Sequence, residues 1–183
     1  MAPSEQTTAP ALQQLLNDAA LAGEWFLDAS RSAVTLKNRS LGGLVRVHGV
    51  FRQVTGNGTV SPAGQVSGAL TVAAASIDTR NARRDTHLRS ADFLDSDNHP
   101  DIAFTVHGIR PSGRGVTVTG TLSVRGRARP LSFDATAAPR GDGEVWLDAE
   151  VGISRADFGL TWNLLGLVSM NNTLTVHAVF TRR

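Results

Sequence analysis

Apolar and polar residues alternate with a period of two through most of this chain from Trp25 onward, and this alternation constrains the fold more than any other feature. In residues 115–126, GVTVTGTLSVRG, three valines and Leu122 share one face, while the threonines and Ser123 share the other. A period of two is that of a β-strand with one buried face. The same alternation predicts about eight strands, located around Val34, Val45, Val66, Ile102, Val116, Leu131, Val145 and Leu174.

Short segments that contain glycine or proline separate these strands. They are TGNG at 55–58, SPAG at 61–64, PSGRG at 111–115, RGRARP at 125–130 and RGDG at 140–143. Tight turns join antiparallel neighbours, and closing eight long strands into a cylinder removes the edges that they would otherwise expose. We therefore predict a mostly β fold, an eight-stranded antiparallel up-and-down barrel. Such a barrel encloses either packed side chains or one small ligand, so the fold alone leaves the function open.

Residues 1–23 are predicted to form an extension that precedes a barrel domain at 24–183. A polar start that contains prolines is followed by ALQQLLNDAALAG, in which leucines and alanines recur at helical spacing. Gly23 stands where a glycine often ends a helix. The polar face of this amphipathic helix carries Gln13 and Asn17 but no lysine or arginine. We therefore expect the helix to pack on the domain rather than to lie on a membrane surface.

The charge composition argues against nucleic acid as a partner. The sequence pI is about 10.3, yet the net charge is only +2, and a protein that grips several phosphates needs a surface of one sign. The absence of cysteine excludes disulfides and thiolate chemistry. No stretch approaches the ~20 apolar residues of a membrane span. The N-terminus lacks the basic and apolar regions of a secretory signal, so the chain as given is expected to be cytoplasmic.

Residues 83–104, RRDTHLRSADFLDSDNHPDIAF, interrupt the alternation with arginines, two histidines and five aspartates. No residue between Thr79 and Arg89 breaks a helix. Leu88 is nearly the only large apolar residue in that interval, so such a helix cannot bury a broad face. We therefore predict a short helix within the 79–95 connection.

This helix is expected to lie across one end of the barrel, pinned there by Leu88, Phe93 and Leu94. Its arginines and its histidine would then face solvent or a ligand. Alternatively, the charges pair among themselves and only fix the crossover, although exposed pairs contribute little, typically under ~1 kcal/mol. The arginines would then pair with Asp85, Asp92, Asp95 and Asp97, and Asp85 precedes Arg89 by four residues, the favourable order on a helix.

The longer segment SIDTRNARRDTHLRSADFLDSDNHPDIAF at 76–104 resembles the signature of the YceI family, lipocalin-like barrels of bacteria that bind polyisoprenoid lipids and quinones. The resemblance covers about residues 24–183 and leaves out the N-terminal helix. It continues through WFLD at 25–28, VHGVF at 47–51, VTGTLSVRGRARPLSF at 118–133 and SRADFGLTWN at 154–163. The family usually carries histidines where this chain has Arg31 and Ser40, and its members are often exported.

The resemblance implies non-enzymatic binding, storage or transport of an isoprenoid lipid inside an apolar barrel cavity. The ligand would be a polyprenyl chain or an isoprenoid quinone, and no cofactor or metal is implied. Head-group contacts are expected from the 83–99 block, and Trp162 is expected at the cavity mouth. The candidate ligand-binding residues are Arg84, His87, Arg89, Phe93, His99, Phe104, Trp162 and Asn163. Space for the lipid is expected beside small residues such as Ala69, Ala73 or Ala74.

Two other functions stay open. An enzyme acting on a lipid-like substrate would use His87 or His99 with Asp92 as acid and base, although no known catalytic motif occurs. A packed barrel would instead serve as an interaction or stress module in which the N-terminal helix pairs two copies into a homodimer, and it predicts no cavity. A metal site is not expected. The segment DSDNHPD lacks the glycine and the distal glutamate of a calcium loop, and the two histidines have no third ligand at suitable spacing.

Overall fold

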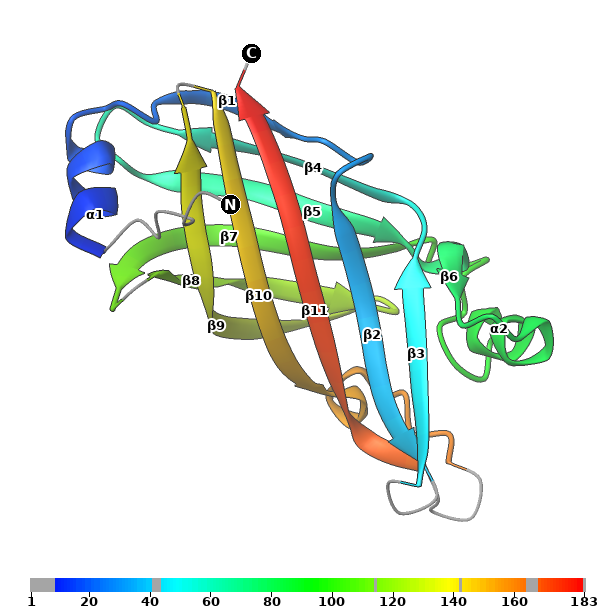
Figure 1. Ribbon diagram of the computed structural model, residues 1–183. Coiled ribbons are helices and arrows are strands. Elements are labelled where there is room, and N and C mark those ends of the chain that lie inside the picture. Colours follow the sequence, from blue (N-terminus) through cyan, green and yellow to red (C-terminus); the bar gives the residue numbers. More distant parts are fainter. Residues whose placement is uncertain (1–8, 41–43, 114, 142, 164–167, 183) are drawn as a thin grey trace.

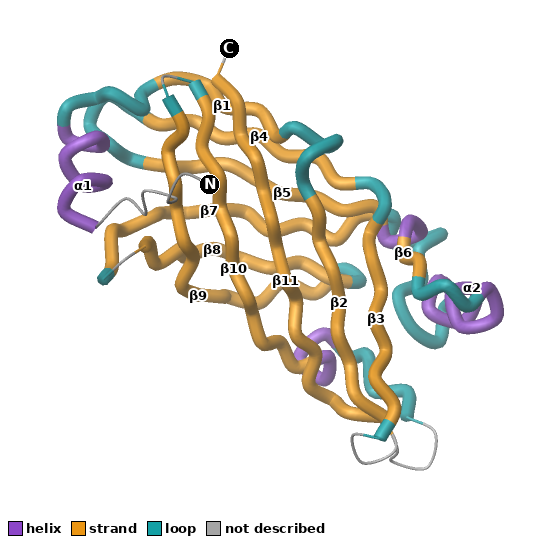
Figure 2. The backbone as a smooth tube through the Cα atoms, viewed as in Figure 1, coloured by secondary structure: helices purple, strands orange, loops and turns teal. Residues whose placement is uncertain are grey.

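The strands close into one antiparallel barrel that carries an α-helix at each end (Figure 1). The computed structural model describes residues 9–40, 44–113, 115–141, 143–163 and 168–182. The predicted mostly β fold is confirmed, and Figure 2 shows that strands make up most of the backbone. In these ranges, no helix combines the length and the hydropathy that a transmembrane helix requires.

The helices and strands follow the chain in a simple order. The helices are α1 (Ala9–Asn17) and α2 (Ala82–Arg89), and short 3-10 helices lie at Ala74–Ser76 and Arg155–Phe158. The strands are β1 (Gly23–Leu27), β2 (Ala33–Ser40), β3 (Val45–Phe51), β4 (Val54–Val60), β5 (Val66–Ala73), β6 (Ile77–Asp78), β7 (Asp101–Ser112), β8 (Gly115–Val124), β9 (Arg127–Arg140), β10 (Glu144–Ser154) and β11 (Val168–Arg182).

These strands occupy eight positions around the barrel, because two of the positions each hold two shorter strands in succession. Strands β1 and β2 both pair with β11, while β4 pairs with β1 and β3 pairs with β2. The remaining positions are β5, β7, β8, β9, β10 and β11, each paired antiparallel with the next. Strand β6 adds a two-residue pairing to β3. The predicted eight-stranded up-and-down barrel is therefore confirmed.

Alternate residues of the strands face the barrel interior, as the period of two predicts. On β8, Val116, Val118, Leu122 and Val124 are at most 5% exposed, whereas the threonines between them are less buried. The buried hydrophobic residues form two clusters inside the barrel, and Phe104 packs against both. The core is thus the interior of the barrel itself, divided along its length.

One predicted turn is wrong. Residues 55–58, TGNG, lie inside β4 and pair with β5 in unbroken register, and the chain turns instead at 52–53. The two strands pack so closely that β5 also needs a glycine opposite this segment. A Cβ on Gly68 of β5 would come within 2.4 Å of the Asn57 carbonyl oxygen. The other four predicted turns are confirmed, and each contains a glycine with positive φ.

Helix α1 ends at Asn17, and the predicted cap at Gly23 is wrong. Ala19 adopts a φ of 55°, which turns the chain out of the helix, and Gly23 is already the first residue of β1. Trp25 then packs back against this turn, and its indole Nε1 donates a hydrogen bond of 2.9 Å to the Leu21 carbonyl oxygen. Tertiary packing of the turn on the barrel therefore overrides the helix propensity of the alanines.

Helix α2 lies at the opposite end of the barrel from α1 (Figure 1). Its N-cap is Asn81, whose side chain accepts a hydrogen bond of 3.0 Å from the backbone N–H of Arg84. The apolar residues Leu88, Phe93 and Leu94 line the barrel interior, so the predicted position across one end is confirmed.

The alternative in which Asp85 pairs with an arginine such as Arg89 is not observed in the described residues. Asp85 is only 6% exposed, and its carboxylate accepts hydrogen bonds from the backbone N–H and the hydroxyl of Thr79. The described residues contain no ion pair between an arginine of α2 and a carboxylate. The two donors of Thr79 satisfy the buried carboxylate, so Asp85 fastens α2 to the residue that follows β6.

Candidate functional site

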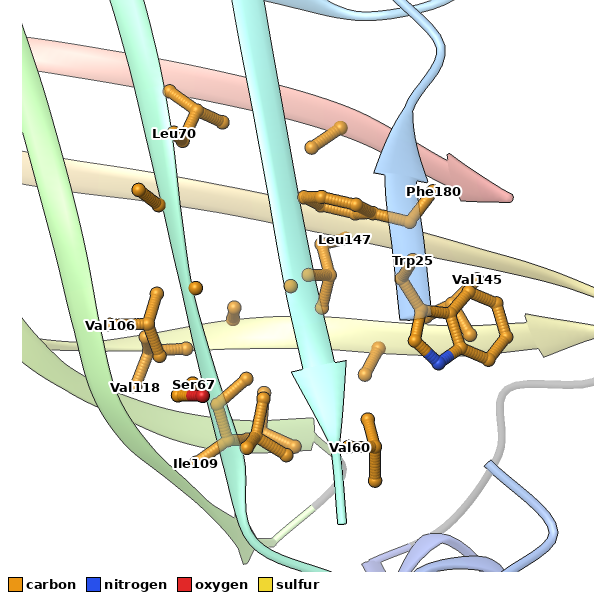
Figure 3. A pocket seen from close by; sticks show the side chains of 18 of the residues that line it. Trp25, Val60, Ser67, Leu70, Val106, Ile109, Val118, Val145, Leu147 and Phe180 are labelled. Atoms are coloured by element: carbon orange, nitrogen blue, oxygen red, sulfur yellow. The ribbon is translucent and has the colours of Figure 1, made fainter. Parts of the chain in front are cut away.

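A first cavity of about 180 Å³ occupies the α1 side of the barrel interior. Figure 3 shows Val106, Val118, Leu147 and Phe180 around one shared space, each from a different strand. The two leucines of α1 that face the barrel, Leu12 and Leu16, also line this space. In the part of the chain that the structure describes, no charged residue lines this α1-side cavity.

A second cavity of about 150 Å³ occupies the α2 side. Its walls are again apolar, except at the far end, where Arg155 and Asn172 face it. Apolar lining residues include Val34, Leu36, Phe51, Leu88, Phe93, Leu94, Ile102, Leu122, Val151 and Leu174. Apolar cavities of ~150 Å³ stay dry and bind small apolar molecules. This α2-side cavity therefore has the size and chemistry to hold hydrocarbon.

The two cavities are adjacent, and we call the residues that line both of them the waist. Leu70, Phe104, Phe133 and Val176 line both of them, and the rings of Phe104 and Phe133 pack with their centroids 5.3 Å apart. The backbone makes room for this pair at Gly120, where a Cβ would come within 2.5 Å of the Phe104 ring. Phe104, a predicted site residue, thus separates the two cavities rather than contacting only one.

The barrel interior is hollow rather than filled. Leu147, Ala149 and Val176 face inward and line cavities, yet each is only partly buried. Side chains in a filled barrel would be fully enclosed by their neighbours at close-packed density. The cavities contradict the packed-barrel alternative, which predicted none.

Small residues create the space, though mostly not those expected. Ala69 lines the α1-side cavity as predicted, whereas Ala73 and Ala74 line neither cavity, and Ala74 is a closely packed core residue. The other alanines that line the α1-side cavity are Ala135, Ala137, Ala149 and Ala178. They lie on β9, β10 and β11, strands in which the sequence pattern predicted alternation without fixing the inward row.

An aromatic cluster lies on the α2 side of the barrel, and of its three members only Phe93 lines the cavity. The His87 ring lies 4.3 Å from the Trp162 ring in an edge-on arrangement and 6.4 Å from the Phe93 ring. Three predicted site residues from two separate parts of the chain are thus brought together. The Nε2 atom of His87 is buried and has no hydrogen-bond partner in the described part of the chain. A buried ring nitrogen without a partner is costly, so a ligand group there would be stabilising.

Arg155 is the residue that sequence reasoning missed. It is 1% exposed, yet it carries a guanidinium that lies 5.5 Å from the Phe93 ring centroid. Its nitrogens donate hydrogen bonds to the carbonyl oxygens of Ser169, Trp162 and Val168, at 3.0, 2.8 and 3.3 Å. Burial lowers its pKa from the usual value. Because five N–H groups are available on a guanidinium, two are left over, and no carboxylate pairs with it among the described residues.

Two asparagines lie beside this buried cation. The Asn38 amide nitrogen donates to the Asn172 side-chain oxygen, while the Asn38 Oδ1 is buried and has no partner in the described residues. Asn172 is 8% exposed and lines the α2-side cavity. Polar groups are therefore concentrated at one end of an otherwise apolar interior.

Three other predicted site residues have structural contacts. Arg84 donates to the hydroxyl and carbonyl oxygens of Thr79, and Arg89 donates to the Ile77 carbonyl oxygen at 2.7 Å, although its Nε is buried without a partner. Asn163 exchanges two hydrogen bonds with the backbone of Val168.

His99 does not lie on a cavity wall. Its Nε2 atom lies 4.0 Å from the Asp95 carboxylate, and its ring packs beside Gly126.

The proposed acid and base of an enzyme are not assembled. No hydrogen bond joins Asp92 to His87 or His99 in the described residues, and Asp92 is exposed. The histidines on strands serve other contacts: His177 pairs with Asp148 at 2.6 Å, and His107 is hydrogen-bonded to Thr121. Among the described residues, the histidines therefore give no paired acid and base at the cavities.

The family usually has histidines where this chain has Arg31 and Ser40, and the structure describes the side-chain contacts of Arg31. Arg31 forms ion pairs of 2.7 Å with Asp28 and 2.8 Å with Glu144, so it joins the turn after β1 to β10. Hydrogen bonds from Ser30 and Arg31 lower the pKa of Asp28 to about 2. The side chain of Ser40 lies outside the described residues.

Comparison with known proteins places the barrel in a sequence family. A model of the YceI-like domain matches residues 25–180. A UPF0312 protein of Pectobacterium carotovorum is 36% identical over 101 residues, and protein YceI of Escherichia coli O157:H7 is 34% identical over 101 residues. In both cases the match covers 52% of either chain, so the chain spans about half the length of the curated relatives it matches.

Solved structures share the fold at lower sequence identity. BcnA of Burkholderia cenocepacia has a TM-score of 0.76 and 23% identity, covering 84% of this chain and 98% of that one. A polyisoprenoid binding domain from Saccharophagus degradans has a TM-score of 0.70 and 17% identity, covering 87% and 98%. The comparison supports the same barrel fold in all three proteins.

Proposed function

Because the chain belongs to the YceI-like family, we propose that its barrel binds an isoprenoid lipid and stores or transports it without converting it. The observation that carries the proposal is the succession of two apolar cavities through one closed barrel. The Saccharophagus degradans structure with this fold is described as a polyisoprenoid binding domain. An isoprenoid is therefore the ligand class that best combines the apolar interior with the family.

The isoprenoid tail supplies most of the affinity in this proposal. Burying one CH₂ group contributes ~0.8 kcal/mol, so a five-carbon prenyl unit contributes about 4 kcal/mol before the cost of ordering the chain. Almost all of the side chains that line the cavities lack hydrogen-bonding groups, so the cavities suit a hydrocarbon tail whatever its branching. To extend from one cavity into the other, the tail would displace the packed rings of Phe104 and Phe133.

The head group belongs at the α2 side in this proposal. That end holds Arg155, with two N–H groups to donate, and Asn38, with a carbonyl oxygen to accept. His87 offers a further unpartnered nitrogen. A quinone carbonyl and a phosphate oxygen both accept hydrogen bonds from a guanidinium, but the phosphate also neutralises its charge. Head-group selectivity therefore depends on Arg155 far more than on Arg84, which the structure ties to Thr79.

The test is a binding series in which the tail is constant and the head group varies. Geranylgeraniol, geranylgeranyl phosphate and a quinone with the same tail would be titrated into the protein while tryptophan fluorescence is followed. We expect all three to bind, with the phosphate and the quinone tighter than the alcohol. Lipid recovered by solvent extraction after incubation should be unchanged, because the proposal includes no turnover.

The variant Arg155→Met separates head-group recognition from tail binding. It should bind the three compounds with nearly equal affinity, whereas Arg155→Lys should keep part of the preference for the phosphate. Arg110→Met is the matched control, because Arg110 is exposed on β7. Failure of the wild-type protein to bind any prenyl compound, or conversion of the bound lipid into a product, would contradict the proposal.

A further inference from the structure

We infer that helix α1 forms the end wall of the α1-side cavity and sets the length of the longest isoprenoid chain that the barrel accepts. This inference rests on the proposed function, because it concerns the same cavity. The helix lies at the opposite end of the barrel from α2 (Figure 1), and Arg155 lines the α2-side cavity. A lipid whose head group lies at Arg155 would therefore direct the free end of its tail toward α1.

The apolar face of α1 is used by the cavity. Leu12 and Leu16 are each 5% exposed and line the α1-side cavity together with Leu21. Gln13 and Gln14 lie on the opposite, exposed face. The two buried leucines of α1 therefore face the cavity, and their side chains are the atoms that a tail would meet.

The wall is fastened to the barrel rather than free to swing. The Arg182 guanidinium at the end of β11 lies 5.6 Å from the Trp25 ring centroid and donates hydrogen bonds to the carbonyl oxygens of Ala20 and Ala22. The turn between β4 and β5 also packs tightly against α1, because a Cβ on Gly64 would come within 3.0 Å of the Leu16 carbonyl oxygen. Contacts on two sides hold α1 at a defined depth.

This wall lies outside the family domain. The YceI-like domain match begins at residue 25, whereas α1 spans Ala9–Asn17. The leucines of α1 that line the cavity therefore come from outside the matched domain. Chain-length selectivity is the property that these leucines would adjust.

The experiment measures the preferred chain length in wild type and in wall variants. A graded series of polyprenyl alcohols that differ by one isoprene unit would compete with a fluorescent fatty acid for the full-length protein. In Leu12→Ala/Leu16→Ala, the wall loses six carbon atoms, close to the five of one isoprene unit. Because cavities left by such truncations collapse only partly, the preferred length should increase by about one isoprene unit. Leu16→Phe, which thickens the wall, should shift the preference to shorter chains.

Gln13→Ala/Gln14→Ala is the matched control, since it changes the exposed face of the same helix, and it should leave the preferred length unchanged. Wild-type binding with identical length profiles in the wall variants would overturn the inference and leave the proposed function intact. A uniform loss of affinity for all lengths in Leu12→Ala/Leu16→Ala would also overturn it, because the helix would then only stabilise the barrel. Absence of binding in wild type would overturn the proposed function as well.

Discussion

Filling the α1-side cavity should make the protein more stable and a poorer lipid binder at the same time. Ala149 on β10 faces this cavity and is only partly buried. The substitution Ala149→Leu adds three carbon atoms to the side chain, and they would occupy space that is otherwise available to the lipid tail. Stability and affinity should therefore change in opposite directions, which few other substitutions would achieve.

The magnitudes follow from the apolar area involved. Three buried carbons contribute about 2.4 kcal/mol at ~0.8 kcal/mol each, and the lost rotamer freedom of leucine subtracts ~0.5–1 kcal/mol. Ala149→Leu should thus raise the free energy of unfolding of the lipid-free protein by about 1.5 kcal/mol. The same carbons displace about half of one prenyl unit, so lipid affinity should fall by up to ~50-fold.

Urea denaturation of the delipidated protein and titration with geranylgeraniol provide the two measurements. Ala74→Leu is the matched control, because Ala74 is 1% exposed in the core and lines neither cavity. Overpacking there should destabilise the protein by ~1–3 kcal/mol. If Ala149→Leu destabilises the protein like Ala74→Leu, the site is already filled and the reasoning from a hollow barrel is refuted.

Three further predictions concern other parts of the molecule. Gly120→Ala should lower the melting temperature and disturb the waist, because the new methyl group would overlap the Phe104 ring; thermal unfolding and the aromatic NMR signals would show it. Arg84→Ala should cost ~1–2 kcal/mol of stability in urea denaturation through the lost hydrogen bonds to Thr79, with little change in lipid affinity. The pKa of Asp28 is about 2 in the folded protein against its usual 3.8, so its contribution to stability is complete above pH 4 and lost as the pH falls through about 2. Acid unfolding of Asp28→Asn should lack that part of the pH dependence.

The barrel could be predicted from sequence because its physical cause is local. Alternate residues of a strand face opposite sides, and the inward row of β8 is legible in the sequence itself. The failures lie where tertiary contacts decide. The segment at 55–58 has the composition of a turn, but its glycines let β4 and β5 approach closely. Likewise, α1 ends early because the chain must turn to place Trp25 on the barrel.

The candidate site was predicted less completely. His87 and Phe93 were identified in the segment that carries the family resemblance, and Trp162 because it stands beside Asn163 and an apolar run; the structure places the three in one cluster. Arg155 was missed because a single arginine before a short acidic and aromatic segment looks like a surface residue. Its burial depends on the carbonyl groups of Trp162, Val168 and Ser169, which come from later in the chain. No local pattern reports such an arrangement.

The most direct test of isoprenoid binding is native mass spectrometry of the protein as purified, followed by solvent extraction and identification of any released lipid. We expect one isoprenoid lipid per barrel, either as purified or after incubation with isoprenoid quinones and prenyl phosphates. A protein whose mass remains that of the bare chain after both treatments would contradict the claim that the two cavities hold an isoprenoid.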